Sequence, residues 1–73
     1  MTEQQIDARG MRCPWPVLRM ARAMREAGAT GGVRMLADDP KAEGEIADLA
    51  RANGWQFAVE PQDDALLITV SRP

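Results

Sequence analysis

The stretch Arg9-Gly10-Met11-Arg12-Cys13-Pro14-Trp15-Pro16 separates a short strand-like segment from a run with helical periodicity. Gly10 ends the first segment, because glycine readily adopts the backbone angles of a sharp turn. Pro14 and Pro16 suit the first turn of a helix, where backbone N–H groups lack intrahelical acceptors and φ is about −65°. The stretch therefore predicts a strand, a turn and a helix, with Cys13 at or beside the N-cap of that helix.

A helix over residues 14–27 is predicted by apolar residues at intervals of three and four positions. These residues are Val17, Met20, Ala21, Met24 and Ala27. Gly28 then suits a left-handed helix terminator. The spacing of Arg19, Arg22 and Arg25 fits the solvated face of an amphipathic helix. The same arginines are also candidates for contacts with an acidic surface of a partner protein.

A second helix is predicted after a strand at residues 33–37. Asp39 can cap the free N–H groups of its first turn, and Pro40 suits the first helical position. One face of this helix carries Ala42, Ile46, Leu49, Ala50 and Asn53. Gly44 either weakens the helix by about 1 kcal/mol relative to alanine or permits a close contact, and Gly54 ends the helix.

Further strands are predicted at residues 5–8, 55–59 and 65–71, with a turn at Pro61–Asp64 before the last of them. The predicted order is β-α-β-α-β-β. Each β-α-β unit favours a parallel, right-handed crossover, and the closing hairpin adds an antiparallel pair. The expected fold class is α/β (α+β), a two-layer sandwich in which two helices cover one face of a four-stranded mixed sheet. We expect one domain over residues 1–73.

The composition narrows the class of protein. The chain has 73 residues, 45% of them hydrophobic, with one cysteine and no histidine. A lone cysteine forms no internal disulfide, and without histidine we expect no metal site and no cofactor. No apolar run reaches the 18 to 20 residues, roughly, of a membrane span, and the N-terminus lacks the pattern of a secretion signal. We therefore expect a cytoplasmic protein without membrane contacts.

The formal net charge of −2 weighs against direct DNA binding, which relies on attraction to phosphates. The charge is unevenly distributed along the chain. Residues 1–37 hold six arginines and three carboxylates, a net charge of +3, whereas residues 38–73 hold three cations and eight carboxylates, a net charge of −5. The half of the chain that contains the cysteine is therefore basic, which would favour a thiolate and steer acidic partners.

The chemistry open to Cys13 is limited by what the chain lacks. Without histidine there is no Cys-His pair, which weighs against a papain-like hydrolase. A dithiol exchange centre needs a second cysteine, and its usual position is occupied by Trp15. At a helix N-terminus the partial positive charge lowers a thiol pKa, which predicts a nucleophile for attack on a persulfide or disulfide sulfur. The alternative is that Cys13 is structural and packs as a small, buried hydrophobic side chain.

The segment Asp7–Pro16 and the later Ala37-Asp38-Asp39-Pro40 resemble the TusA/SirA-like sulfur-carrier family, whose pattern is Asp-x-x-Gly-x-x-Cys-Pro-x-Pro with Asp-Pro before the second helix. The resemblance covers nearly the whole chain. It implies the same β-α-β-α-β-β sandwich. It also implies a sulfurtransferase role in which Cys13 accepts sulfur as a persulfide from a cysteine desulfurase or a rhodanese-like donor. A downstream acceptor protein would then serve tRNA thiolation, molybdenum-cofactor assembly or sulfur oxidation.

The resemblance carries over to individual residues unevenly. Cys13 matches the sulfur-carrying cysteine, and the site-shaping positions are Gly10, Pro14 and Pro16. Asp39 matches the start of the second helix, with simple capping as the alternative. Trp15 departs from the smaller or acidic residue common at its position, and it is either a docking residue or a lid. The remaining candidates, Arg12 for support of the sulfur anion and Arg19 for docking, lie in the basic half, whereas Trp55 is expected in the core.

Two other functions stay open at this point. The chain could be a regulatory module that binds protein or RNA and in which Cys13 is structural. The acidic net charge and the 4% aromatic content make RNA the weaker partner. Cys13 could also sense oxidants by forming a mixed disulfide with another thiol.

Overall fold

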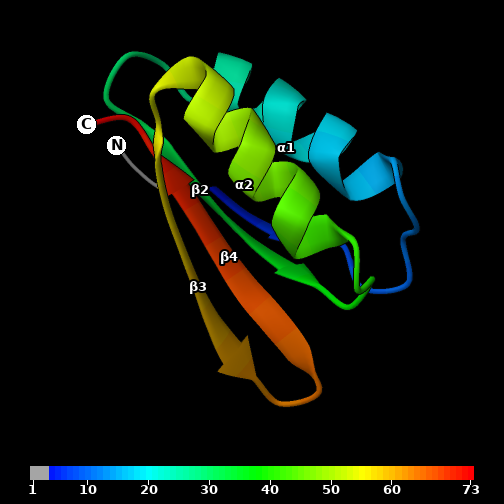
Figure 1. The fold of residues 1–73 in the computed structure, drawn as a ribbon. Coiled ribbons are helices and arrows are strands. Elements are labelled where there is room, and N and C mark those ends of the chain that lie inside the picture. Colours follow the sequence, from blue (N-terminus) through cyan, green and yellow to red (C-terminus); the bar gives the residue numbers. More distant parts are fainter. Residues whose placement is uncertain (1–3) are drawn as a thin grey trace.

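The arrangement of strands and helices matches the predicted fold class. A computed structural model of the protein describes residues 4–73. Residues 1–3, which count toward the charge of the basic half, lie outside the described part of the chain. In chain order the elements are β1 (Gln4–Asp7), α1 (Trp15–Glu26), β2 (Gly32–Ala37), α2 (Ala42–Asn53), β3 (Gln56–Gln62) and β4 (Ala65–Ser71). Figure 1 shows the two helices side by side over the sheet.

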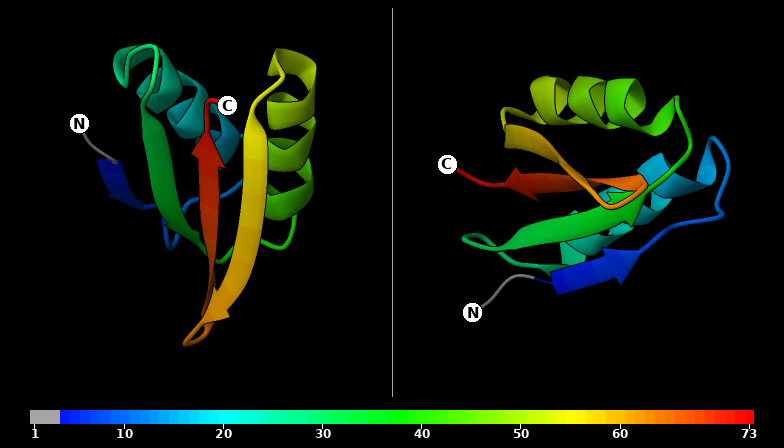
Figure 2. Two further views of the ribbon diagram at one scale, coloured as in Figure 1. Left: turned by 90° about the vertical axis from the view of Figure 1, so that its left-hand side faces the viewer. Right: turned by 90° about the horizontal axis from the view of Figure 1, so that it is seen from below.

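The four strands form one mixed sheet in the order β1-β2-β4-β3. β1 runs parallel to β2, and β4 runs antiparallel to both of its neighbours. β2 and β3 therefore point the same way, as expected for a β-α-β unit, but β4 lies between them. In the left panel of Figure 2 the strands follow this order from left to right, with both helices behind them.

The core lies between the helices and one face of the sheet. Ile6, Met35, Ile68 and Val59 stand in register across the four strands. The helices cover this row with buried residues, which are Pro16, Met20, Ala23 and Met24 from α1 and Ala42, Ile46 and Ala50 from α2. The predicted stripes are thus confirmed at their centres. At their edges Val17, Ala21, Ala27 and Leu49 are only half-buried and Asn53 is exposed.

Two predicted boundaries are wrong. α2 begins at Ala42 with Lys41 as its N-cap, rather than at Asp39 and Pro40, and no side chain caps it. The turn between β3 and β4 contains only Asp63 and Asp64, because Pro61 continues β3 and lies opposite Leu66. A proline is tolerated there because β3 is an edge strand, so the missing N–H leaves no inner ladder bond unmade.

The glycines near the helices have different roles. Gly28 and Gly54 have φ values of +85° and +72°, which confirms both as left-handed helix ends. A Cβ added at Gly44 would meet nothing within 4 Å. The close contact considered for Gly44 is therefore absent, and this glycine only weakens α2.

The C-terminal segment is hydrogen-bonded to the C-terminal end of α1. Arg72 Nη1 donates to the carbonyls of Met24 and Gly28, at 2.9 Å and 2.7 Å. Its guanidinium also lies 5.2 Å from the ring centroid of Trp55, which packs against the core as expected. Among residues 4–73, no helix combines the length and apolar character needed to cross a bilayer.

Candidate functional site

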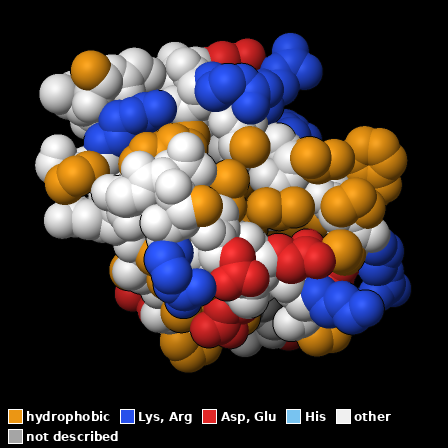
Figure 3. All heavy atoms as spheres, turned by 45° about the horizontal axis from the view of Figure 1, so that its top comes forward, with side chains coloured by type: hydrophobic (Ala, Val, Ile, Leu, Met, Phe, Trp, Pro, Cys, Tyr) orange, Lys and Arg blue, Asp and Glu red, His pale blue; other side chains and the backbone are white. Residues whose placement is uncertain are grey.

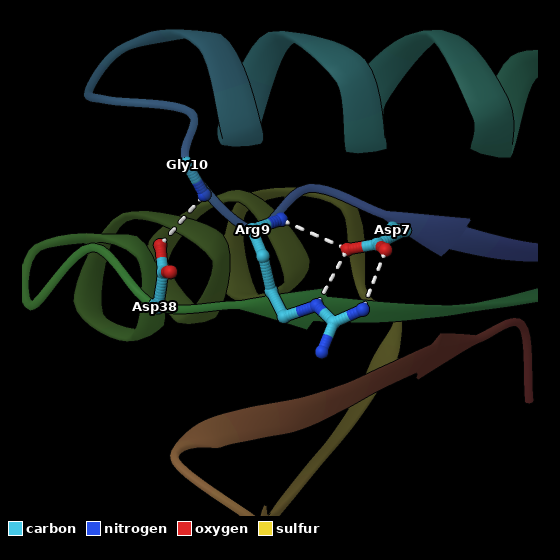
Figure 4. Close-up of polar contacts among 4 residues, drawn as sticks. All are labelled: Asp7, Arg9, Gly10 and Asp38. Carbon is cyan, nitrogen blue, oxygen red and sulfur yellow. Dashed lines mark hydrogen bonds and ion pairs between the residues drawn. The ribbon is translucent and has the colours of Figure 1, made fainter.

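The segment that precedes α1 is anchored where the parallel strands β1 and β2 end. Gly10 has a φ of +87°, and its N–H donates to Asp38 Oδ1 at 3.0 Å. Asp7 accepts hydrogen bonds from the backbone and the guanidinium of Arg9, which hold the pKa of the Asp7 carboxyl at about 2 (Figure 4). These bonds explain why the sequence pattern has aspartate at position 7 and glycine at position 10, because together they set the path of the chain toward Cys13.

Asp39 joins this segment to the loop before α2. Its Oδ2 accepts the backbone N–H of Cys13, and its Oδ1 accepts the N–H of Lys41 at 3.1 Å. Asp39 is also 9% exposed, and these two hydrogen bonds lower the pKa of its carboxyl. The expected helix cap is therefore a clamp between two loops, with one oxygen serving each of them.

Cys13 is half-buried and lies just before the N-cap residue of α1, which is Pro14. The Cys13–Pro14 peptide bond is cis, and Pro16 lies in the first turn of the helix. Cys13 Sγ donates a hydrogen bond to Glu45 Oε2 of α2, at 2.7 Å.

The pKa of Cys13 is raised, so the predicted lowering by the helix N-terminus is wrong. The largest cause is the hydrogen bond to Glu45, followed by burial and by the negative charges of Glu45 and Asp39. Lys41 acts in the opposite direction but does not outweigh them. The carboxylates of the acidic half of the chain therefore keep the thiol protonated.

Lys41 is the cation among the main charges that act on Cys13, and the proposed support of the sulfur by Arg12 stays a prediction. The Arg12 side chain is exposed, and its positive charge helps to lower the pKa of Asp39. The positive charge of Lys41, a residue that the sequence did not suggest, lowers the pKa of Cys13. The sequence also did not suggest Glu45; its place in the first turn of α2 was the only available signal.

The exposed side of α1 carries an apolar groove of about 350 Å³. It is lined by Met11, Trp15, Leu18, Arg19 and Arg22, which we call the α1 groove. Trp15 is 62% exposed and Leu18 is 52% exposed. Figure 3, with the helical side turned toward the viewer, shows hydrophobic side chains gathered on the right, with basic side chains above and below them.

The structure thus brings Asp39 to Cys13, holds Gly10 on Asp38, and places Trp15 and Arg19 together in the α1 groove. Trp55 lies at the other end of the sheet, since β3 begins at Gln56 opposite Ser71. Within residues 4–73, no three His, Cys, Asp or Glu side chains are grouped in a way that could hold a metal ion. What remains is one thiol whose proton is held by a carboxylate.

A two-layer β-α-β-α-β-β domain with one thiol between the end of β1 and the start of α1 defines a class of small thiol-bearing domains. Comparison with known proteins assigns the chain within it. The sulfurtransferase TusA family matches residues 4–72, and the chain belongs to this family.

Two relatives agree with this assignment. An Archaeoglobus fulgidus protein named "Putative sulfur carrier protein" is 37% identical over 65 residues, covering 88% of this chain and 84% of that protein. The crystal structure of a SirA-like protein from Desulfitobacterium hafniense superposes with a TM-score of 0.87 at 32% identity, covering 97% of this chain and 96% of the other. The family, the fold and the named relative support a role as a sulfur carrier.

Proposed function

We propose that the protein is a sulfurtransferase that carries sulfur as a persulfide on Cys13. The observation that carries the proposal is the position of the lone thiol, half-buried at the start of α1 and held by contacts from α2 and its preceding loop. A thiol placed in this way is reachable by a partner, yet it is held in one orientation by the fold.

The transfer needs no cofactor. The Cys13 sulfur attacks the terminal sulfur of a donor persulfide, so the S–S bond of the donor breaks as a new S–S bond forms at Cys13, and the inner sulfur of the donor leaves as a thiolate. Cys13 then carries a persulfide, and a thiolate of the acceptor removes the terminal sulfur in the same way. No oxidant is consumed, because one S–S bond is exchanged for another in each step.

The proposed partners are proteins: a cysteine desulfurase or a rhodanese-like protein as donor, and a downstream sulfur acceptor. We propose the α1 groove as their docking surface. Trp15 and Leu18 are large apolar side chains with more than half of their area exposed, and Arg19 and Arg22 lie beside them. This surface fits a partner that presents an apolar side chain flanked by carboxylates. Trp15 is therefore assigned to docking rather than to a lid.

The test is to incubate the reduced protein with a cysteine desulfurase and free cysteine, and then to weigh the intact chain. We expect a gain in mass of one sulfur atom in the wild type and none in Cys13→Ser. A wild type that gains no sulfur from several active desulfurases and rhodaneses contradicts the proposal. Transfer from the loaded protein to tRNA-thiolation, molybdenum-cofactor or sulfur-oxidation acceptors would then identify the pathway.

The second candidate is a regulatory binding module in which Cys13 is structural or senses oxidants. It is favoured by the hydrogen bond from the thiol to Glu45, because a structural cysteine is also protonated and partly buried. The two candidates differ in the effect of Cys13→Ser. A binding module keeps its partners and its cellular function with serine at this position, whereas a sulfur carrier loses all transfer.

A further inference from the structure

Glu45 is placed to do more than hold the thiol. Its Oε2 lies 2.7 Å from Cys13 Sγ, within reach of the proton that the thiol must lose when its sulfur attacks. Its Oε1 is buried and has no hydrogen-bond partner within the described part of the chain. No other described group therefore competes with the thiol for this carboxylate.

The charges around Cys13 decide where its proton can go. Loss of the proton to solvent would leave a thiolate beside two carboxylates, Glu45 of α2 and Asp39 of the preceding loop, and Lys41 only partly offsets them. Transfer of the proton to Glu45 leaves the pair with a single negative charge. Transfer within the hydrogen bond thus avoids the repulsion between two adjacent anions.

We propose that Glu45 accepts the proton of Cys13 when the thiol takes up sulfur, and returns it when the sulfur is passed on. This inference rests on the proposed sulfur-carrier function. On loading, the S–S bond of the donor persulfide breaks, a new S–S bond forms at Cys13, the thiol proton moves to Glu45 and the donor leaves as a thiolate. On unloading, an acceptor thiolate takes the terminal sulfur, and the departing Cys13 sulfur recovers the proton from Glu45. Each full cycle leaves Cys13 and Glu45 unchanged.

Two other residues, Asp39 and Arg12, position this pair rather than take part in the transfer. The clamp by Asp39 fixes the backbone of Cys13 relative to the first turn of α2, where Glu45 resides. Arg12 acts on Asp39 and so supports the clamp.

The experiment measures sulfur uptake by Cys13 from glutathione persulfide, a small donor that needs no docking surface. Rates are followed by intact mass from mildly acidic to alkaline pH for the wild type, for Glu45→Gln and for Glu43→Gln. Glu43 is an exposed carboxylate in the same turn of α2, so its variant is the matched control for loss of one charge. Glutathione persulfide also titrates in this pH range. Because every protein is tested with the same donor, this effect cancels when the rate of a variant is divided by the rate of the wild type at the same pH.

We expect Glu45→Gln to take up sulfur about 100-fold more slowly than the wild type near pH 6, where thiolate is scarce and a proton acceptor is needed. At alkaline pH, where thiolate forms without help, the variant should equal or exceed the wild type. Glu43→Gln should follow the wild type throughout, and Glu45→Asp should recover part of the acidic rate.

Rates for Glu45→Gln that match or exceed the wild type at every pH overturn the role of Glu45 while the sulfur-carrier function stands. A wild type that takes up no sulfur overturns both. A second measurement uses the wild type alone and so does not depend on the folding of any variant. Uptake at acidic pH should be slower in heavy water than in light water, because the proton moves in the rate-determining step; equal rates in the two solvents contradict the inference.

Discussion

The Cys13 thiol donates a hydrogen bond to the Glu45 carboxylate, at 2.7 Å and across 32 positions of sequence. This contact reverses the expectation drawn from the position of Cys13 at a helix start. The dipole of α1 would favour a thiolate, but the thiol faces the carboxylates of the α2 side. In the resting protein the Cys13 thiol is therefore protonated, and its reactivity depends on the donor or on the removal of the thiol proton.

The first prediction concerns alkylation of Cys13. The rate with iodoacetamide, measured against pH, should give an apparent pKa above that of free cysteine, because Glu45 stabilises the protonated thiol. In Glu45→Gln the apparent pKa should fall, so the alkylation rate should level off at a lower pH than it does in the wild type. An unchanged profile in this variant would show that the hydrogen bond does not form in solution.

The same raised pKa affects folding stability with a defined sign. The folded state holds the Cys13 proton more tightly than the unfolded chain does, so this contribution is present below the unfolded pKa and is lost as the pH rises through the folded one. The stability of the wild type should therefore fall in the alkaline range more steeply than that of Cys13→Ser. Urea unfolding at neutral and alkaline pH measures the difference.

The second prediction concerns Asp39. Removing its carboxylate leaves the N–H groups of Cys13 and Lys41 without their acceptor, so Asp39→Ala should lower the free energy of unfolding by about 1–3 kcal/mol. Asp48→Ala is the control, because Asp48 forms an exposed ion pair with Arg51 and its loss should change stability by no more than about 0.5 kcal/mol. Equal losses in the two variants, measured by urea unfolding, would contradict the clamp.

The third prediction compares two glycines of α2. Gly44→Ala should stabilise the protein by about 1 kcal/mol, because Gly44 lies within the helix and its Cβ would enter open space. Gly54→Ala should destabilise it, because Gly54 has a φ of +72°. Thermal unfolding of both variants should shift in opposite directions, and a fall in stability for Gly44→Ala would indicate a contact that the structure lacks.

The fourth prediction separates docking from chemistry. Trp15→Ala should slow sulfur uptake from a desulfurase about 10-fold or more, because an exposed aromatic anchor is lost from the α1 groove. Its uptake from glutathione persulfide and its free energy of unfolding should stay near the wild-type values. Met20→Ala is the contrasting variant, since Met20 is fully buried and its truncation should cost about 2–5 kcal/mol of stability. Slower uptake from both donors in Trp15→Ala would place Trp15 at the chemistry instead.

Much of the fold follows from the sequence because the signals are local. The apolar spacing in α1 predicts its buried residues Met20 and Met24, and Gly28 and Gly54 end the helices as expected. The sequence predicts the start of α2 too early, because Asp39 has two possible uses, as a helix cap or as an acceptor for a distant loop. Only the approach of Cys13 decides between them.

The sequence by itself determined the order of the elements, the lone thiol before α1 and the absence of histidine or a second cysteine to assist it. These properties depend on short-range backbone preferences and on which side chains exist. The tertiary structure alone decided that β4 lies between β2 and β3, that Asp39 clamps two loops, and that Glu45 holds the proton of Cys13. The reactivity of a thiol depends on charges within a few ångströms in space, and here folding brings the decisive charge from the other helix.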